Sequence, residues 1–161
     1  MEVVDFLVQQ HREAEDLMAK ALDTDNPAER LQYYKRAADH LAAHIASEEQ
    51  ILFPAVNAHR TEDILLESLE EHLSLKRLVA DLNGLRPDDA TFEPKLKVLR
   101  EQAAHHHEEE EDDLFPKIRH LLPEADRHAL AEAMLQLQRD MVQEGAPRAP
   151  LTDETDEAAR L

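Results

Sequence analysis

The chain contains no cysteine and no tryptophan, and only two of its 161 residues are glycine. Without cysteine it has no disulfide, no thiolate metal ligand and no cysteine nucleophile. The scarcity of glycine leaves little turn chemistry for a β-sheet, whereas good helix formers such as alanine, leucine and glutamate are abundant. No apolar run approaches the roughly 18 residues of a membrane span. The composition therefore predicts an all-α protein without a transmembrane segment.

Acidic residues outnumber basic ones by 36 to 18, which gives a formal net charge of −18. Nucleic acids and anionic membranes attract surfaces rich in lysine and arginine, so we expect neither as a partner. The N-terminus lacks the charged-then-apolar pattern of a signal peptide. Together with the absence of cysteine, this favours a cytoplasmic protein.

Apolar residues recur with a helical period along most of the chain, and capping residues divide the pattern. Asn26 is typical of an N-cap, with Pro27 at the first helical position, and Asn83-Gly84 is typical of a C-cap. Pro54 is expected to kink or end the second helix. The predicted helices cover residues 2–22, 27–53, 61–83, 91–116 or slightly beyond, and 123–145.

Short connections place neighbouring helices antiparallel. We therefore predict an up-down-up-down four-helix bundle over residues 1–122, with an additional C-terminal helix at 123–145. Residues 146–161 contain prolines and acids without a periodic apolar face, so we expect a disordered tail there.

A weak internal duplication is the most informative feature of the sequence. The pattern H-x-x-x-E-E-x-x-L-F-P begins at His44 and again 62 residues later at His106. His11 and His72 precede these two motifs at nearly the same offset, each in a similar run of residues. Each half is therefore predicted to be a helical hairpin with one histidine on its first helix and His-x-x-x-Glu on its second.

Residues four apart lie about 40° apart around a helix and roughly 6 Å along it, so they share a face. A single His-x-x-x-Glu is commonly a solvated ion pair, but two in register with Leu-Phe-Pro and a matched histidine argue for a buried set. Such groups are costly to bury unless they are paired or bound to metal. Donors without sulfur suit iron, manganese or zinc. The predicted metal ligands are His11, His44, Glu48, His72, His106 and Glu110.

The remaining histidines are assigned by the register of the repeat. His105 and His107 are expected beside the ligands rather than among them. His40, one turn before His44, has two interpretations: a position in the outer layer around the centre, or one near the metal. The histidines that match nothing in the repeat are expected at the surface: His59, His120 and His128.

The ordered set of motifs resembles the hemerythrin-like (HHE cation-binding) domain family over roughly residues 3–120. The resemblance implies a four-helix bundle that holds a non-haem di-iron centre, bridged by Glu48, Glu110 and a solvent-derived oxygen species. It implies a protein that binds or reacts with a small diatomic or anionic ligand such as oxygen, peroxide or nitric oxide. Iron sensing, iron storage or delivery, and a plain helical scaffold stay open as alternatives.

One position departs from the oxygen-carrying members of that family. They have a fifth histidine one turn after the third-helix histidine, and this chain has Lys76 there. The matching place on the first helix is Glu15. Two interpretations follow: a Glu15–Lys76 ion pair that closes the bundle, or Glu15 as an additional ligand. Either one disfavours five-histidine oxygen carriage.

Overall fold

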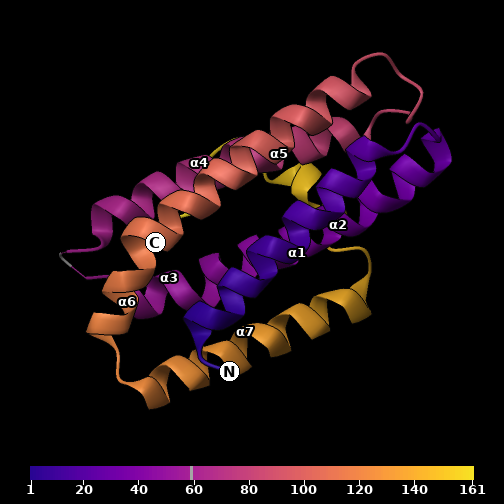
Figure 1. The fold of residues 1–161 in the computed structure, drawn as a ribbon. Helices are drawn as coiled ribbons and strands as arrows, with labels where there is room; N and C mark the ends of the chain where they lie inside the picture. The colour runs from indigo at the N-terminus through magenta and orange to yellow at the C-terminus, as the bar shows by residue number, and fades with distance from the viewer. Residues whose placement is uncertain (59) are drawn as a thin grey trace.

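A computed structural model describes residues 1–58 and 60–161, and these residues form helices and loops without a strand (Figure 1). The α-helices are α1 (Val3–Asp23), α2 (Pro27–Ser47), α3 (Phe53–Val56), α4 (Glu62–Asn83), α5 (Phe92–Glu109), α6 (Phe115–Leu121) and α7 (Glu124–Glu144). Two π-helical turns, η1 (Glu48–Leu52) and η2 (Glu110–Leu114), and a 3₁₀ turn, η3 (Ala149–Asp153), complete the set. His59, expected at the surface, lies outside the described residues.

The architecture confirms the predicted up-down-up-down bundle with an additional helix. α1 packs on α2 and α5, and α4 packs on α5. α7 runs alongside α1 and α2 on the outside of the bundle (Figure 1). None of the helices in the described part of the chain is long and apolar enough to cross a membrane.

The helix boundaries follow the capping residues. The side chain of Asn26 accepts hydrogen bonds from the backbone N–H groups of Ala28 (2.9 Å) and Glu29 (3.2 Å), and Pro27 begins α2. α4 ends at Asn83, with Gly84 as its C-cap. These local signals were sufficient to place the helix ends because the cap satisfies backbone groups that the helix leaves free.

Pro54 and Pro116 do not end their helices. Each is the second residue of a short α-helix that continues directly from a π turn. In those turns the N–H of Phe53 donates to the carbonyl of Glu48, and the N–H of Phe115 donates to that of Glu110, five residues earlier. A proline ring clashes with the carbonyl four residues before it, and the wider turn relieves that clash. Each helix therefore continues past its proline by way of a π turn instead of ending there.

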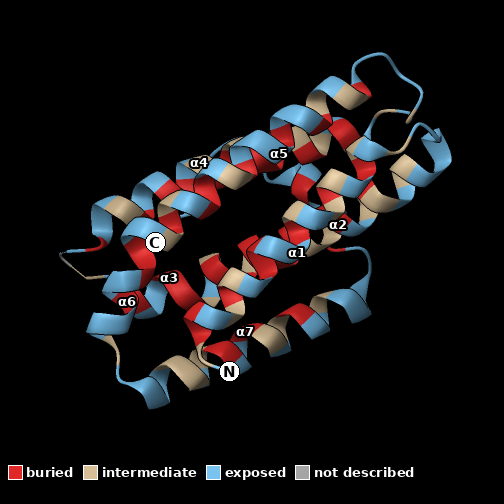
Figure 2. Cartoon of the chain, viewed as in Figure 1, coloured by how far each residue is buried: buried red, intermediate tan, exposed pale blue. Residues whose placement is uncertain are grey.

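The core consists of two apolar clusters, one toward each end of the bundle. Along α1, for example, Leu7 belongs to one cluster and Ala14 to the other, and His11 lies between them. The same order holds on α4, where Leu69 and Leu75 flank His72. Figure 2 shows the buried residues lining the inner faces of these helices. A buried polar layer thus separates the two halves of the core.

The C-terminal segment differs from the expected disordered tail. Leu151 is only 4% exposed and joins the core cluster that α2 and α4 share. Arg148 forms an ion pair with Asp39 of α2 (Nη1–Oδ2, 2.8 Å), and its carbonyl accepts from Asn83 of α4 (3.2 Å). The segment is held by one buried apolar side chain, Leu151, and by a few polar contacts. Such contacts produce no periodic pattern in the sequence, so the sequence did not predict this packing.

We expect Leu151→Ala to lower the free energy of unfolding by about 2–3 kcal/mol, because it removes a buried side chain and leaves a cavity. Asp153→Ala, a change at an exposed neighbour, should stay within about 0.5 kcal/mol of the parent protein. Urea denaturation of the three proteins measures both values. Equal midpoints for Leu151→Ala and the parent would show that the segment does not pack in solution.

Candidate metal centre

The six residues predicted as ligands come together in the middle of the bundle. One histidine comes from each of α1, α2, α4 and α5, and the two glutamates are the first residues of the π turns. All of them are at most 2% exposed: His11, His44, Glu48, His72, His106 and Glu110.

Each glutamate faces one histidine from each hairpin. Glu48 places Oε1 3.0 Å from Nε2 of His44 and Oε2 3.1 Å from Nε2 of His72. Glu110 places Oε1 3.1 Å from Nε2 of His106 and 3.4 Å from Nε2 of His11. Both carboxylates therefore lie where they can bridge two ions.

His107 corrects the sequence-based register. It was expected beside the centre, yet it is 1% exposed, and its ring stacks on that of His11 with centroids 3.8 Å apart and planes 6° apart. It lies with His11 and His44 in a set whose donor atoms are all within 4.8 Å of one another. The repeat aligns His107 with Ile45, which is also buried. That apolar partner was the available signal that this position points inward.

The centre thus has two unequal sides. Site A denotes His11, His44 and His107, and site B denotes His72 and His106, with the two glutamates between them. His105, by contrast, is exposed and pairs with Glu109 on the surface (3.0 Å), as expected for a flanking residue.

The donor atoms of the centre fit a pair of metal ions. Among the described residues, the buried side-chain atoms without a hydrogen-bond partner are Nε2 of His11, His44 and His107 and both carboxylate oxygens of Glu48 and Glu110. Polar atoms left in this state are costly unless something binds them. Imidazole and carboxylate donors without sulfur suit iron, manganese or zinc.

Each histidine of the centre is held by its second ring nitrogen. Nδ1 of His11 donates to Glu111 (3.0 Å) and Nδ1 of His72 to Glu49 (2.9 Å), the residues that follow Glu110 and Glu48. The other three Nδ1 atoms have acceptors in Gln10 for His44 (2.9 Å), Glu71 for His106 (2.9 Å) and Glu15 for His107 (3.1 Å). An acceptor at Nδ1 favours the tautomer whose Nε2 can bind a metal. In the metal-free protein the Nε2 atoms of His72 and His106 lie 3.1 Å from each other.

Burial and charge set the proton affinities in the metal-free protein. Burial lowers the pKa of His107 to about 3, so this imidazole is neutral. Burial acts against the charged forms of His106 and Glu110 as well, but their mutual attraction outweighs it. The pKa of His106 is therefore well above its usual value, and that of Glu110 well below. A metal ion must displace the protons that these pairs hold.

Glu15 and Lys76, at the positions that differ from the oxygen-carrying members of the family, do not pair with each other. Glu15 accepts from His107 and forms an ion pair with Arg12 (3.2 Å). Lys76 is 3% exposed, and its Nζ donates to Glu49 (2.8 Å) and to Glu154 of the C-terminal segment (3.1 Å). The predicted Glu15–Lys76 ion pair is therefore wrong. Glu15 contacts the centre by accepting a hydrogen bond from Nδ1 of His107.

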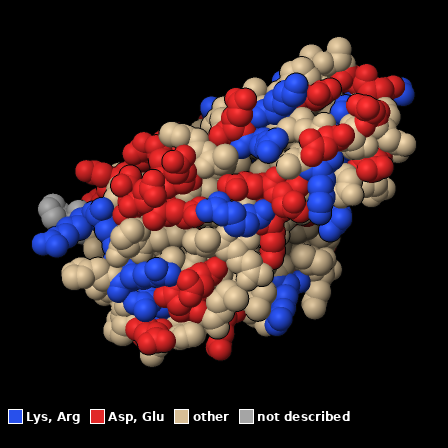
Figure 3. All heavy atoms as spheres, viewed as in Figure 1, with Lys and Arg blue, Asp and Glu red and all other residues tan. Residues whose placement is uncertain are grey.

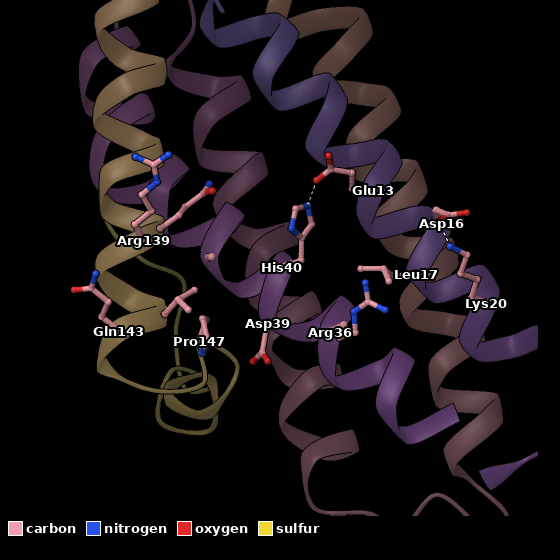
Figure 4. A pocket seen from close by; sticks show the side chains of 13 residues that line it. Glu13, Asp16, Leu17, Lys20, Arg36, Asp39, His40, Arg139, Gln143 and Pro147 are labelled. Atoms are coloured by element: carbon pink, nitrogen blue, oxygen red, sulfur yellow. Dashed lines mark ion pairs between the residues drawn. The ribbon is translucent and has the colours of Figure 1, made fainter. Parts of the chain in front are cut away.

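His40 takes the outer of its two predicted positions. Its Nε2 lies 3.1 Å from the backbone carbonyl of Gln10 and 3.6 Å from the carboxylate of Glu13. It lines a groove of about 820 Å³ between α1, α2 and α7. Figure 4 shows its ring directed toward Glu13. His120 is exposed and the side chain of His128 is 45% exposed, as expected.

The sequence matches a family model described as the hemerythrin HHE cation binding domain, over residues 2–118. The chain belongs to this family. A crystal structure of a hemerythrin HHE cation binding domain-containing protein from Mycobacterium kansasii superposes with a TM-score of 0.78. The match covers 95% of this chain and 98% of that chain at 18% identity, so it supports the fold. α7 and the C-terminal segment lie beyond the residues that the family model matches.

A curated relative of this hemerythrin-family protein is a "DNA nickase" from Nostoc sp.. The two are 25% identical over 122 residues, which make up 76% of this chain. The chain spans only 35% of that relative's length. Family membership supports metal binding by the shared domain, whereas the nickase name describes the longer protein.

Replacing each of the two histidines beside His106 by alanine tests whether His107 belongs to the centre. We expect His107→Ala to reduce the bound metal from two ions toward one per chain, because site A loses an imidazole. His105→Ala removes only a surface ion pair and should keep both ions. Elemental analysis of the two purified variants decides the matter, and two ions retained in both would restore the register expected from the sequence.

Proposed function

We propose that the protein holds two iron ions in this centre and uses them to bind or reduce a small oxidant. The observation that supports this most directly is the set of buried nitrogen and oxygen atoms without partners, aimed into one space from four helices. Without metal, the two carboxylates are offset only by imidazoles that lie 3.0–3.4 Å away, and charged groups buried in this way are costly.

The ligands would be distributed unequally between the two ions. His11, His44 and His107 would hold one ion and His72 and His106 the other, with Glu48 and Glu110 shared. Iron bound there supplies one-electron chemistry with oxygen, peroxide or nitric oxide, whereas zinc in the same donors has no redox step. Phe53 and Phe115 stack on His72 and His11, with centroids 5.5 and 5.6 Å apart. They exclude water from those sides of the centre.

The unequal histidine count indicates where a small ligand would bind. Site A offers three imidazoles and site B two, so an ion at site B keeps more positions for solvent or an incoming ligand. Lys76 does not attract anions as a free cation there, because Glu49 and Glu154 already neutralise its charge. It instead holds Glu49 in position to accept from His72.

An iron-responsive module is the second candidate, and one chain of contacts favours it. His72 donates to Glu49, which accepts from Lys76, which in turn donates to Glu154 of the C-terminal segment. The occupancy of site B is thereby linked to the surface. In that role the protein would change its stability or its C-terminal packing with iron and would need no reaction with oxidant.

The nickase activity of the Nostoc relative is not carried over in this proposal. Acidic side chains gather over the C-terminal end of α5 (Figure 3), where Glu108, Asp112 and Asp113 are exposed. With a net charge of −18, this surface opposes the approach of phosphate backbones.

Metal should stabilise the fold, since it satisfies donors that are otherwise buried without partners. At a free metal concentration about 1,000 times the dissociation constant, the stabilisation is about 4 kcal/mol, or a rise in Tm of roughly 10 °C. Protons compete for the imidazoles, so the rise should shrink as the pH falls from about 7.5 toward about 5. Differential scanning calorimetry of chelated and loaded samples measures it. Equal Tm values would contradict a structural role for the ions.

Rapid mixing separates the two candidate functions. We expect the reduced, iron-loaded protein to be oxidised by oxygen or peroxide, with a lasting rise in near-ultraviolet absorbance in a stopped-flow experiment. A zinc-loaded sample serves as the control and should show no change. A spectrum that returns to that of the reduced protein under vacuum would indicate reversible oxygen carriage, and no reaction at all would favour the iron-responsive module.

A further inference from the structure

α7 brings one polar side chain to the interior of the bundle. The buried residues of this helix are Ala131, Met134 and Gln138. The first two are apolar, while Gln138 is 8% exposed and carries an amide. It borders the groove between α1, α2 and α7 that Figure 4 shows. The helix lies outside residues 2–118, so the match to the family does not account for this side chain.

Gln138 is paired with Gln10 of α1. Nε2 of Gln10 donates to Oε1 of Gln138 (2.7 Å), and Nε2 of Gln138 donates back to Oε1 of Gln10 (3.0 Å). The second N–H of Gln138 donates to Oγ of Ser47 (2.9 Å). Oε1 of Gln10 also accepts from Nδ1 of His44 (2.9 Å), so the pair reaches a residue of site A.

The direction of every bond in this network is set by a backbone carbonyl. Ser47 donates its hydroxyl proton to the carbonyl of His44 (2.9 Å), which can only accept. The Ser47 oxygen is then the acceptor for the amide N–H of Gln138. This orients the Gln138 amide, which in turn orients that of Gln10 and turns its oxygen to His44.

The orientation of Gln10 decides which nitrogen of His44 carries the proton. With the Gln10 oxygen facing Nδ1, the proton is on Nδ1 and the lone pair of Nε2 points into the centre. A reversed amide would donate to Nδ1 and leave the proton on Nε2. His44 in that tautomer cannot bind a metal through Nε2.

The other half of the repeat needs no such support. Glu71 occupies the place of Gln10, directly before the first-helix histidine, and accepts from Nδ1 of His106 (2.9 Å). A carboxylate has no N–H and can only accept. Site B therefore keeps its tautomer without help from another helix, whereas the amide at position 10 depends on a partner that holds it.

We propose that Gln138 is a positioning residue for site A: through Gln10 it fixes His44 in the tautomer that binds metal. The affinity of one of the two ions thus depends on the C-terminal helix. This inference rests on the proposed metal centre and adds to it a residue outside the domain that the family model matches.

Zinc binding to the full chain tests the proposal, because zinc is diamagnetic and needs no redox step. Isothermal titration should show two ions per chain in the parent protein. Gln138→Leu should weaken one of the two by roughly 10- to 100-fold, as loss of an outer partner does, and leave the other unchanged. Gln136→Leu, the same change at an exposed position of α7, should bind both ions like the parent.

Gln10→Glu provides the second arm, because a carboxylate there accepts from His44 unaided. In that background Gln138→Leu should cost less than about three-fold in affinity. Long-range ¹⁵N–¹H spectra of the zinc-loaded proteins should show the proton of His44 on Nδ1 in the parent and in the double variant. In Gln138→Leu alone, the zinc-bound Nε2 signal of His44 should weaken.

The outcomes are separable. Two ions bound with unchanged affinity in Gln138→Leu would overturn the positioning role and leave the metal centre intact. An equal loss at both sites, or a loss that Gln10→Glu fails to rescue, would show that Gln138 acts only by packing and would overturn the proposal as well. A parent protein that binds no zinc and no iron would refute the metal centre itself, and this inference with it.

Discussion

The negative charge of Glu48 and Glu110 in the middle of the bundle is the constraint on which the rest of the structure depends. A buried carboxylate is tolerated only with partners that offset its lost hydration. Burial and the charge of Glu110 both raise the pKa of Glu48, yet the imidazoles of His44 and His72 outweigh them and the net shift is downward. The histidines in turn require acceptors at Nδ1. Three of those acceptors form ion pairs, Glu15 and Glu111 with Arg12 and Glu49 with Lys76. The polar layer is therefore built outward from the two glutamates to the surface.

Much of this arrangement could be predicted from the sequence because it rests on local signals. Helix ends followed caps such as Asn26 and Gly84, and the duplication located the two buried glutamates of the centre, since residues four apart share a helix face. His107 was missed because the repeat was used to choose one ligand from a run of three histidines. The rule that the two halves match does not hold at this position, where Ile45 packs in one half and His107 faces the centre in the other.

Other features had no local signal. Each π turn lies between a buried glutamate and a proline six residues later. The pattern H-x-x-x-E-E-x-x-L-F-P does not show whether the helix continues past that proline or ends at it. The C-terminal segment is held by Leu151 and by contacts to residues more than 60 positions away. Long-range contacts of this kind leave no periodicity in the segment itself. The sequence therefore predicts the helical bundle and the six residues that meet at its centre, whereas the π turns and the packing of the C-terminal segment are seen only in the structure.

The two halves of the duplication support each other in a particular way. The first-helix histidine of each half has its Nδ1 acceptor and a stacked phenylalanine in the other half: Glu49 and Phe53 contact His72, and Glu111 and Phe115 contact His11. The second-helix histidine is held within its own half, by Gln10 for His44 and by Glu71 for His106. A single hairpin therefore contains only half of each environment.

A half-length chain with these features would complete the centre only by pairing with a second copy about a two-fold axis, each copy presenting the same surface to the other. The internal repeat has the geometry of such a homodimer joined into one polypeptide. Joining frees the halves to diverge, since a change in one is no longer copied into the other. The two halves of this chain differ at two such equivalent positions: His107 corresponds to Ile45, and Gln10 corresponds to Glu71.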